Sequence, residues 1–270
     1  DLNWFFNQWF MGKGHPELEI TYTYDSTTSL QHIVVDQLQD VDEYAMFRLP
    51  VDIDIYIGSV KQTYHVIVDS VSMTFSFNVS AKPDLVNFDA QKVLVCTKSE
   101  NHTMAEMKFM YQNAPLFKDK YEALLFAYSE ENDVDVAKSV ILDAMMDEYA
   151  GIRSLAISFY DKFNEIEDLK LRDVLVYSLQ NDPSSSVRTE AAIALYDYYT
   201  WDEGMGNIFA NQITADSSFM VISELIRGIA ISDSTLGLKY AKMFENTKNL
   251  DVMLSCAEVY SVYGNKSNSD

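Results

Sequence analysis

The sequence has few basic residues, few cysteines and no long apolar run. Lys and Arg total 20 against 41 Asp and Glu, which gives a formal charge of −21. Such a surface repels phosphate backbones and anionic lipids, so we expect no nucleic-acid partner. No stretch approaches the roughly 18 apolar residues of a membrane-spanning helix, so no membrane span is expected. Cys96 and Cys256 lie far apart in the sequence. We therefore expect both to be buried among apolar side chains rather than to form a disulfide framework or a metal site.

Local catalytic motifs are also missing. The sequence contains no H-E-x-x-H, no G-x-S-x-G and no P-loop, so neither a two-histidine zinc face nor a local nucleophile or phosphate cradle is indicated. None of the four histidines lies three or four residues from another: His15, His32, His65 and His102. We expect His32 and His65 to be strand residues with a hydrogen-bonded ring nitrogen. No catalytic, cofactor-binding or metal-ligating residue is predicted, and the chain by itself is expected to be inactive.

Two acidic clusters are the remaining candidates for a cation site. Both lack the central Gly and the closing Glu of an EF-hand loop. Because the whole chain is acidic, we interpret both as solvated loops, with calcium binding left open. Their members are Asp36, Asp40, Asp42 and Glu43 in the first cluster, and Glu130, Glu131, Asp133 and Asp135 in the second.

The first part of the chain has a hydrophobic period of two. Between about residues 17 and 97, apolar and polar residues alternate in several short runs, such as "LEITYTY", "VDIDIYI" and "MTFSFNV", separated by polar turns. This spacing predicts an antiparallel β-sandwich. In the last of these runs, Phe75 and Phe77 are expected to face the interior and Ser76 to face away from it.

From about Tyr121 to Val262 the period becomes 3.6, which predicts a series of amphipathic helices. Four segments align, with their starts at Ile152, Val187, Val221 and Val252 and offsets of 35, 34 and 31 residues. These offsets are typical of helix-pair repeats. "NDPSSSVRTEAAIAL" looks like a HEAT repeat, in which Ala191, and Ala156 one repeat earlier, make close helix contacts. The predicted fold is therefore an antiparallel β-sandwich followed by an all-α HEAT-like superhelix.

Three stretches resemble the aminopeptidase N family of zinc metallopeptidases: "DLNWFFNQWFMGKGHPELEI", "FRLPVDIDI" and "KPDLVNFDAQKVLV", at residues 1–20, 47–55 and 82–95. The first resembles the closing stretch of that family's catalytic domain, and the others resemble its sandwich domain. The resemblance implies three parts: a terminal helix of a truncated catalytic domain at 1–15, a β-sandwich domain at 16–102, and a HEAT-like helical domain at 103–270.

The chain departs from the family where the chemistry would be. The zinc-binding H-E-x-x-H with its downstream Glu is missing, and so is the G-x-M-E-N motif, so no catalytic residue is carried over. The resemblance implies a parent enzyme that removes N-terminal residues from peptides with a zinc-activated water. This chain would be its noncatalytic C-terminal region, with no cofactor of its own. Its partners would be the upstream catalytic domain of the same polypeptide and peptide substrates.

Two hypotheses follow. In the first, the helical domain walls or gates the active-site cleft of the aminopeptidase. In the second, the sandwich and the repeats form a noncatalytic scaffold that binds peptides or proteins. An H-E-x-x-H encoded upstream would favour the first, and a degenerate motif there would favour the second.

Overall fold

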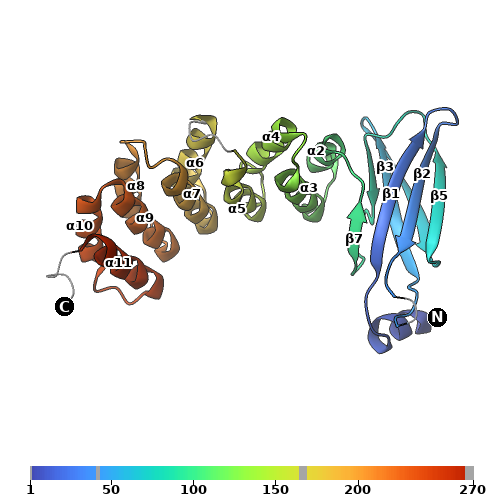
Figure 1. Ribbon diagram of the computed structural model, residues 1–270, viewed down its shortest axis with the longest axis horizontal. Coiled ribbons are helices and arrows are strands. Elements are labelled where there is room, and N and C mark those ends of the chain that lie inside the picture. The colour runs from blue at the N-terminus through green and yellow to red at the C-terminus, as the bar shows by residue number, and fades with distance from the viewer. Residues whose placement is uncertain (1, 41–42, 164–168, 265–270) are drawn as a thin grey trace. The chain divides into compact units, whose positions relative to one another are not determined.

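The computed structural model describes residues 2–40, 43–163 and 169–264. The chain forms two compact units, Asp1–Val136 and Ala137–Asp270. The described strands and helices α1 to α3 belong to the first unit, and α5 to α11 belong to the second (Figure 1). The predicted order of a β-sandwich followed by an all-α part is confirmed.

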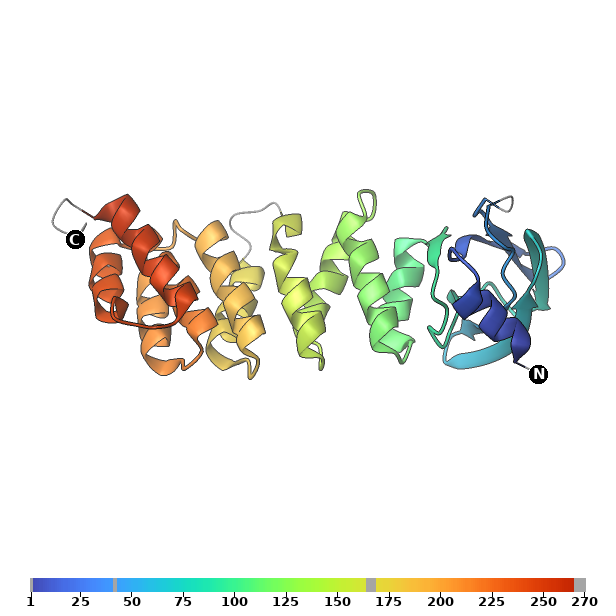
Figure 2. The same ribbon diagram turned by 90° about the horizontal axis from the view of Figure 1, so that it is seen from below.

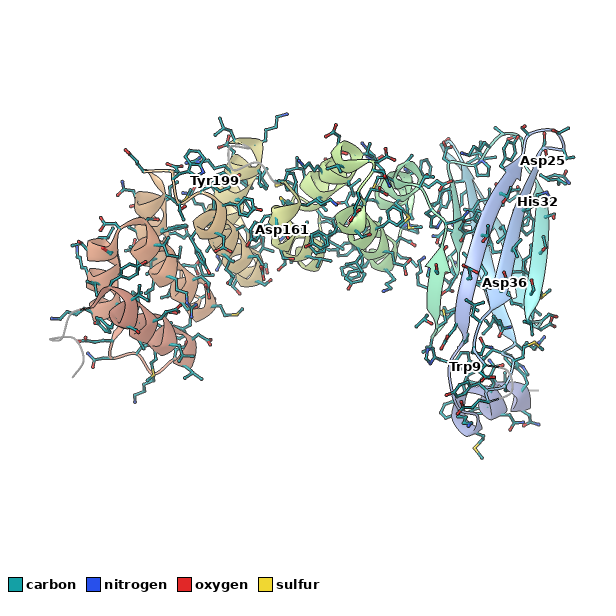
Figure 3. The ribbon with its side chains drawn as sticks, in the orientation of Figure 1. Trp9, Asp25, His32, Asp36, Asp161 and Tyr199 are labelled. Carbon is teal, nitrogen blue, oxygen red and sulfur yellow. The ribbon has the colours of Figure 1, made fainter. Side chains whose placement is uncertain are left out.

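The chain begins with a short helical segment. Helix α1 (Asn3–Phe6) continues directly into the π-helical turn η1 (Asn7–Met11). The segment ends at Gly12, whose backbone is extended, and Pro16 then precedes the first strand. This aromatic segment packs at one end of the sandwich, where Trp9 is labelled in Figure 3.

Within the described residues, seven strands form the two sheets of the sandwich. Adjacent strands are antiparallel, except that β7 runs parallel to β1, an exception to the predicted antiparallel pattern. In the order of pairing, the first sheet contains β5 (Ser72–Asn78), β2 (Leu30–Gln37), β1 (Glu17–Asp25) and β7 (Thr97–Glu100). The second contains β4 (Val60–Val68), β3 (Leu49–Ile57) and β6 (Leu85–Phe88).

The sandwich core forms where the apolar residues of the two sheets meet. Ile20 and Ile33 from the first sheet and Ile53 and Phe88 from the second belong to one buried cluster. This is the expected result of period-two alternation, because every second side chain points to the same face. Along β5, Phe75 and Phe77 pack against this core and Ser76 is exposed, so the predicted strand register is confirmed.

Two helices follow the strands within the first unit: α2 (Met104–Asn113) and α3 (Phe117–Ser129). A capping box starts α2, because Thr103 and Glu106 each bind the backbone N–H of the other. Phe109 of α2 packs edge-on against Tyr56 of β3, with ring centroids 5.8 Å apart. The division into compact units therefore falls after these two helices rather than at the last strand.

The second unit is a stack of helices. Helices α5, α7, α9 and α11 contact one another in that order, and α6, α8 and α10 each pack on the helix that follows (Figure 2). The four stacked helices contain the four segments aligned in the sequence, and Ala156 and Ala191 are both fully buried in them.

No described helix is long and apolar enough to cross a membrane. The bounds are α4 (Val134–Ala144), which crosses the boundary between the units, α5 (Ala150–Ser158), η2 (Tyr160–Phe163), α6 (Leu169–Asn181), α7 (Ser185–Tyr198), α8 (Met205–Ala215), α9 (Phe219–Ser232), α10 (Ser234–Phe244) and α11 (Leu250–Tyr263).

Candidate functional site

A groove lies beside the first helical segment, and Gln8 fixes that segment to the sandwich. The Gln8 side chain accepts a hydrogen bond from the backbone N–H of Arg48 at 2.8 Å and donates one to the Arg48 carbonyl at 3.2 Å. The neighbouring Trp9 packs on Phe47, with ring centroids 5.4 Å apart. The Arg48 guanidinium lies 4.9 Å from the centre of the Trp4 ring, in cation–π contact. Gln8 and Trp9 of the first stretch therefore anchor it to Arg48 and Phe47 of the second.

The opposite wall of the groove is a loop that Asp89 holds in place. The buried Asp89 carboxylate accepts hydrogen bonds from the N–H groups of Val93 at 3.0 Å and Leu94 at 3.1 Å. Burial raises the pKa of Asp89, against the opposing effect of these two donors. Asp89 and Lys92 both have φ of 52°, in the left-handed region, so the loop turns sharply just before Val93.

We call this feature the aromatic groove. Its volume is about 590 Å³, and Arg48 is the charged residue of its lining. Several apolar side chains remain open to solvent: Phe10 is 70% exposed, Val93 64% and Val95 72%. Apolar and aromatic side chains make up most of the lining, and this composition suits contact with another apolar surface. It consists of Trp4, Phe5, Trp9, Phe10, Arg48, Leu49, Pro50, Val93, Leu94 and Val95.

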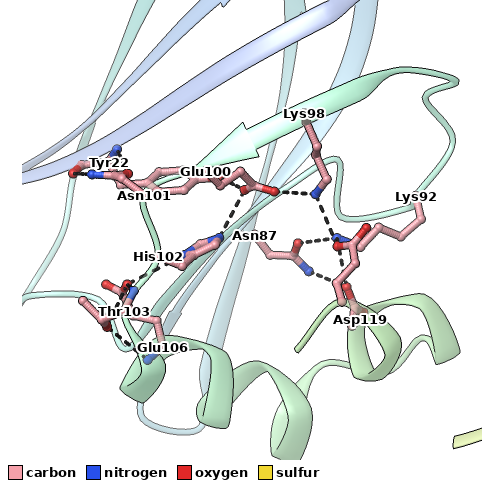
Figure 4. A network of polar contacts seen from close by, with 11 residues as sticks. Tyr22, Asn87, Lys92, Lys98, Glu100, Asn101, His102, Thr103, Glu106 and Asp119 are labelled. Atoms are coloured by element: carbon pink, nitrogen blue, oxygen red, sulfur yellow. Dashed lines mark hydrogen bonds and ion pairs between the residues drawn. The ribbon is translucent and has the colours of Figure 1, made fainter. Parts of the chain in front are cut away.

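The second candidate site is a buried network of charged and polar side chains between the sandwich and helices α2 and α3 (Figure 4). Glu100 of β7 lies at its centre. Its carboxylate accepts hydrogen bonds from the Tyr22 hydroxyl and from Lys98 Nζ at 2.5 Å, and its Oε2 lies 3.1 Å from His102 Nε2. Lys98 also lies 3.3 Å from Glu122 of α3. One buried carboxylate thus connects two strands to the start of the helices.

The network continues through Lys92 to α3. Lys92 Nζ lies 3.2 Å from Asp119 Oδ1 and 2.9 Å from Glu122 Oε2, and it donates to Asn87 Oδ1 at 2.9 Å. Asn87 in turn donates to Asp119 at 3.0 Å. The Lys92 and Asp119 side chains are 7% and 0% exposed, so these charges are balanced by each other rather than by water.

Burial and pairing shift the pKa values in this network. For Glu100, burial alone would raise the pKa, but His102 and Lys98 hold it well below its ordinary value. For Lys98, burial opposes the charge, but Glu100 and Glu122 bring the pKa above its ordinary value. Burial and the Glu100 charge raise the pKa of Tyr22 well above its ordinary value. Glu100 and Lys98 are therefore charged and Tyr22 neutral across the physiological range.

The histidines lie in separate places. His32 contacts Ser76 Oγ at 2.8 Å through Nδ1, and His65 contacts Asp52 Oδ1 at 2.5 Å, so both expected ring contacts are confirmed. Within the described residues, no three or more His, Cys, Asp or Glu side chains are grouped so that they could hold a metal ion.

Among the described residues, the two cysteines and the members of the acidic clusters lie in different surroundings. Cys256 is buried, whereas Cys96 is half-buried against the sandwich core. In the first acidic cluster Glu43 pairs with Lys13 at 3.4 Å, and Asp42 lies outside the described residues. In the second cluster, the Glu130 side chain accepts hydrogen bonds from two backbone N–H groups of its own loop.

Sequence reasoning missed the polar network. Its members are spread from Tyr22 to Glu122, and no short motif joins them. The capping-box spacing of Thr103 and Glu106 was the one local signal that marked the place where α2 begins.

Comparison with known proteins gives similarity to solved structures but no match to a family model or a curated protein. Among solved structures, the chain is similar to the crystal structure of Legionella pneumophila aminopeptidase A in complex with aspartic acid, with a TM-score of 0.44 and 13% sequence identity. The match covers 97% of this chain and 33% of that one, so the chain spans about a third of its length. This similarity is too low to assign an activity.

Proposed function

We propose that this chain is the noncatalytic C-terminal part of a zinc aminopeptidase, and that its aromatic groove receives the catalytic domain of the same polypeptide. One observation carries the proposal. The three stretches that resemble the aminopeptidase N family, residues 1–20, 47–55 and 82–95, all contribute side chains to this one groove. Their meeting at one surface supports a common role for these three distant stretches.

The chemistry of the groove suits a domain interface. A continuous exposed apolar patch with aromatic residues and an arginine is typical of surfaces that bind another protein surface. Trp4 and Phe5 supply the aromatic contacts, and Arg48 supplies a planar cation already stacked on Trp4. Burying Phe10 and Val95 against a partner would remove apolar area from water, at about 25 cal/mol for each Å².

In this proposal the zinc and the peptide substrate belong to the catalytic domain, and the helical unit walls or gates the cleft. Its repeat spacing supports a HEAT-like array, because such arrays present an extended surface built from equivalent helices. The Arg153–Asp182 and Arg188–Asp216 pairs recur at that spacing and support the same assignment.

Two measurements test the proposal. The gene upstream of Asp1 should encode an intact H-E-x-x-H with a downstream Glu. The complete polypeptide should then contain zinc by elemental analysis and cleave an aminoacyl reporter, whereas residues 1–270 alone should do neither. A degenerate motif upstream would overturn the enzymatic part of the proposal.

The groove is tested separately with two matched valines. Val95 lines the groove and Val60 starts β4 outside it, and they are 72% and 68% exposed. In the complete polypeptide, Val95→Asp should lower the melting temperature and the activity, since it places a charge in the interface, while Val60→Asp should change neither. Equal effects of the two substitutions would show that the groove is not the docking site.

The scaffold hypothesis keeps one observation in its favour. The stacked helices of the second unit expose apolar side chains, with Met220 and Ile231 of α9 at 49% and 45% and Leu254 of α11 at 54%. A noncatalytic scaffold would bind peptides through these residues whatever the upstream sequence encodes. Peptide binding that persists beside a degenerate upstream motif would favour this second function.

A further inference from the structure

His102 is a buried histidine in the segment between β7 and α2. Its side chain is 4% exposed, and its ring stacks on Tyr22 with centroids 4.9 Å apart and planes 26° apart. A histidine in such a place normally has both ring nitrogens satisfied. Here Nδ1 is buried and has no partner within hydrogen-bond distance.

Two carboxylates from different elements face the two ring nitrogens. Nε2 lies 3.1 Å from Glu100 of β7, and Nδ1 lies 3.7 Å from Glu106 of α2 (Figure 4). A neutral imidazole carries one N–H and can serve one carboxylate, whereas an imidazolium carries two and can serve both. The geometry therefore suits the protonated ring.

We propose that His102 is a pH-dependent clamp, in which the imidazolium holds the first turn of α2 to β7 and loss of its proton releases the α2 side. The Glu100 contact is at hydrogen-bond distance, so the proton that remains after deprotonation stays on Nε2. Nδ1 then presents a lone pair to the Glu106 carboxylate, and attraction becomes repulsion. The contact to Glu106 is lost first, and the contact to Glu100 is kept.

The other charged and polar groups around the ring do not replace His102 in this role. On the β7 side Lys98 balances Glu100, and the Tyr22 hydroxyl of β1 donates to it. Glu122 of α3 reaches the network through Lys98. On the α2 side, Glu106 accepts from the N–H and hydroxyl of Thr103, and the cation that faces it among the described contacts is His102. Lys82 lines a pocket together with His102, without a described ion pair to either carboxylate.

The direction of the pH dependence follows from these surroundings. Burial alone would lower the pKa of His102, but the Glu100 and Glu106 carboxylates raise it above its ordinary value. A raised pKa in the folded state means that the clamp is fully present below about pH 6.5, the ordinary histidine pKa, and is lost as the pH rises through the folded pKa. Burial opposes the Glu106 charge, but His102 and Thr103 hold the pKa of Glu106 below its ordinary value, so Glu106 stays charged over that range.

Nuclear magnetic resonance of the imidazole nitrogens of residues 1–270 tests the clamp. The His102 ring should titrate above the ordinary histidine value. Amide hydrogen exchange in the first turn of α2, corrected for its intrinsic pH dependence, should become several-fold faster as the ring loses its proton. A His102 midpoint at or below the ordinary value, or exchange in α2 that does not follow it, would overturn the proposal in the unmodified chain.

A conservative variant separates the clamp from a merely structural contact. In Glu106→Gln the glutamine keeps the capping position but loses the charge. The His102 midpoint should shift downward and the pH-dependent step in α2 exchange should disappear. An unchanged His102 midpoint in this variant would show that Glu106 does not hold the proton.

Discussion

Arg188 donates hydrogen bonds to both carboxylate oxygens of Asp216, from Nε at 2.6 Å and from Nη2 at 2.9 Å. Its Nη1 donates to the backbone carbonyl of Asp182, at 2.8 Å, in the turn that precedes its own helix. One repeat earlier, Arg153 makes the same contacts with the Asp182 carboxylate and the Asp147 carbonyl. Each arginine thus ties its own turn to the next, and the repeat in the sequence becomes a continuous chain of contacts.

Neutralising Asp216 should destabilise the helical unit. Asp216→Asn leaves the Arg188 guanidinium without its charged partner in a place where the two side chains are 16% and 2% exposed. Removing one partner of a buried pair costs about 3–5 kcal/mol. The matched control is Glu258→Gln, because Glu258 pairs with Arg227 while 58% exposed, and exposed pairs contribute about 1 kcal/mol or less. Urea unfolding followed by the helical circular dichroism signal should rank the variants in this order, and equal midpoints would contradict it.

The same pair predicts an acid dependence. Burial alone would raise the pKa of Asp216, but Arg188, the Ser218 N–H and Gln212 hold it below its ordinary value. A depressed pKa means that the stabilisation is present above the unfolded pKa of about 3.9 and is lost as the pH falls through the folded pKa. The difference in unfolding free energy between wild type and Asp216→Asn should therefore stay constant near neutrality and shrink in acid. A difference that does not change with pH would mean that Asp216 carries no such charge.

The sequence predicted the fold because its signals are local. Alternation in β5 placed Phe75 and Phe77 inside. A helical period with offsets of 35, 34 and 31 residues placed four residues on equivalent helices: Ile152, Val187, Val221 and Val252. Each of these inferences needs a window of only a few turns or strand residues. The parallel pairing of β7 with β1 was not predicted, since the pairing joins residues about 80 apart.

The polar network was beyond sequence reasoning for the same reason. Tyr22, Glu100 and Asp119 come from three elements, and nothing in the spacing of a carboxylate shows which lysine or histidine the fold will bring to it. The aromatic groove was not predicted: the stretches that form it stood out one by one, but their meeting at Arg48 and Val93 depends on the packing of the sandwich. Motifs identify pieces of a surface, and the fold assembles them.

Phe77 should be important for holding the edges of the two sheets together. Its ring, on β5, lies 3.9 Å from the ring of Tyr64 on β4, measured between centroids, and both pack against the sandwich core. Phe77→Ala should cost about 3 kcal/mol, because it removes apolar contact and leaves a cavity between the sheets. Thr74→Ala, on the exposed face of the same strand, is the control and should cost about 1 kcal/mol or less. A loss no larger than that of the control would show that the strand register is wrong.

Gly237 permits the close approach of α10 to α9. A Cβ added there would lie 2.4 Å from both the Cα and the Cβ of Ala230, which is closer than any packed contact and involves the backbone of a buried helix. Gly237→Ala should therefore cost about 1–3 kcal/mol through overpacking, in spite of the better helix propensity of alanine.

Gly206 of α8 provides the matched control, because a Cβ there would meet Ser232 at an ordinary 3.4 Å. Gly206→Ala should be neutral or stabilising by up to about 1 kcal/mol. Thermal unfolding of the two variants compares them directly, and a Gly237→Ala protein as stable as Gly206→Ala would mean that α9 and α10 lie farther apart than the structure shows.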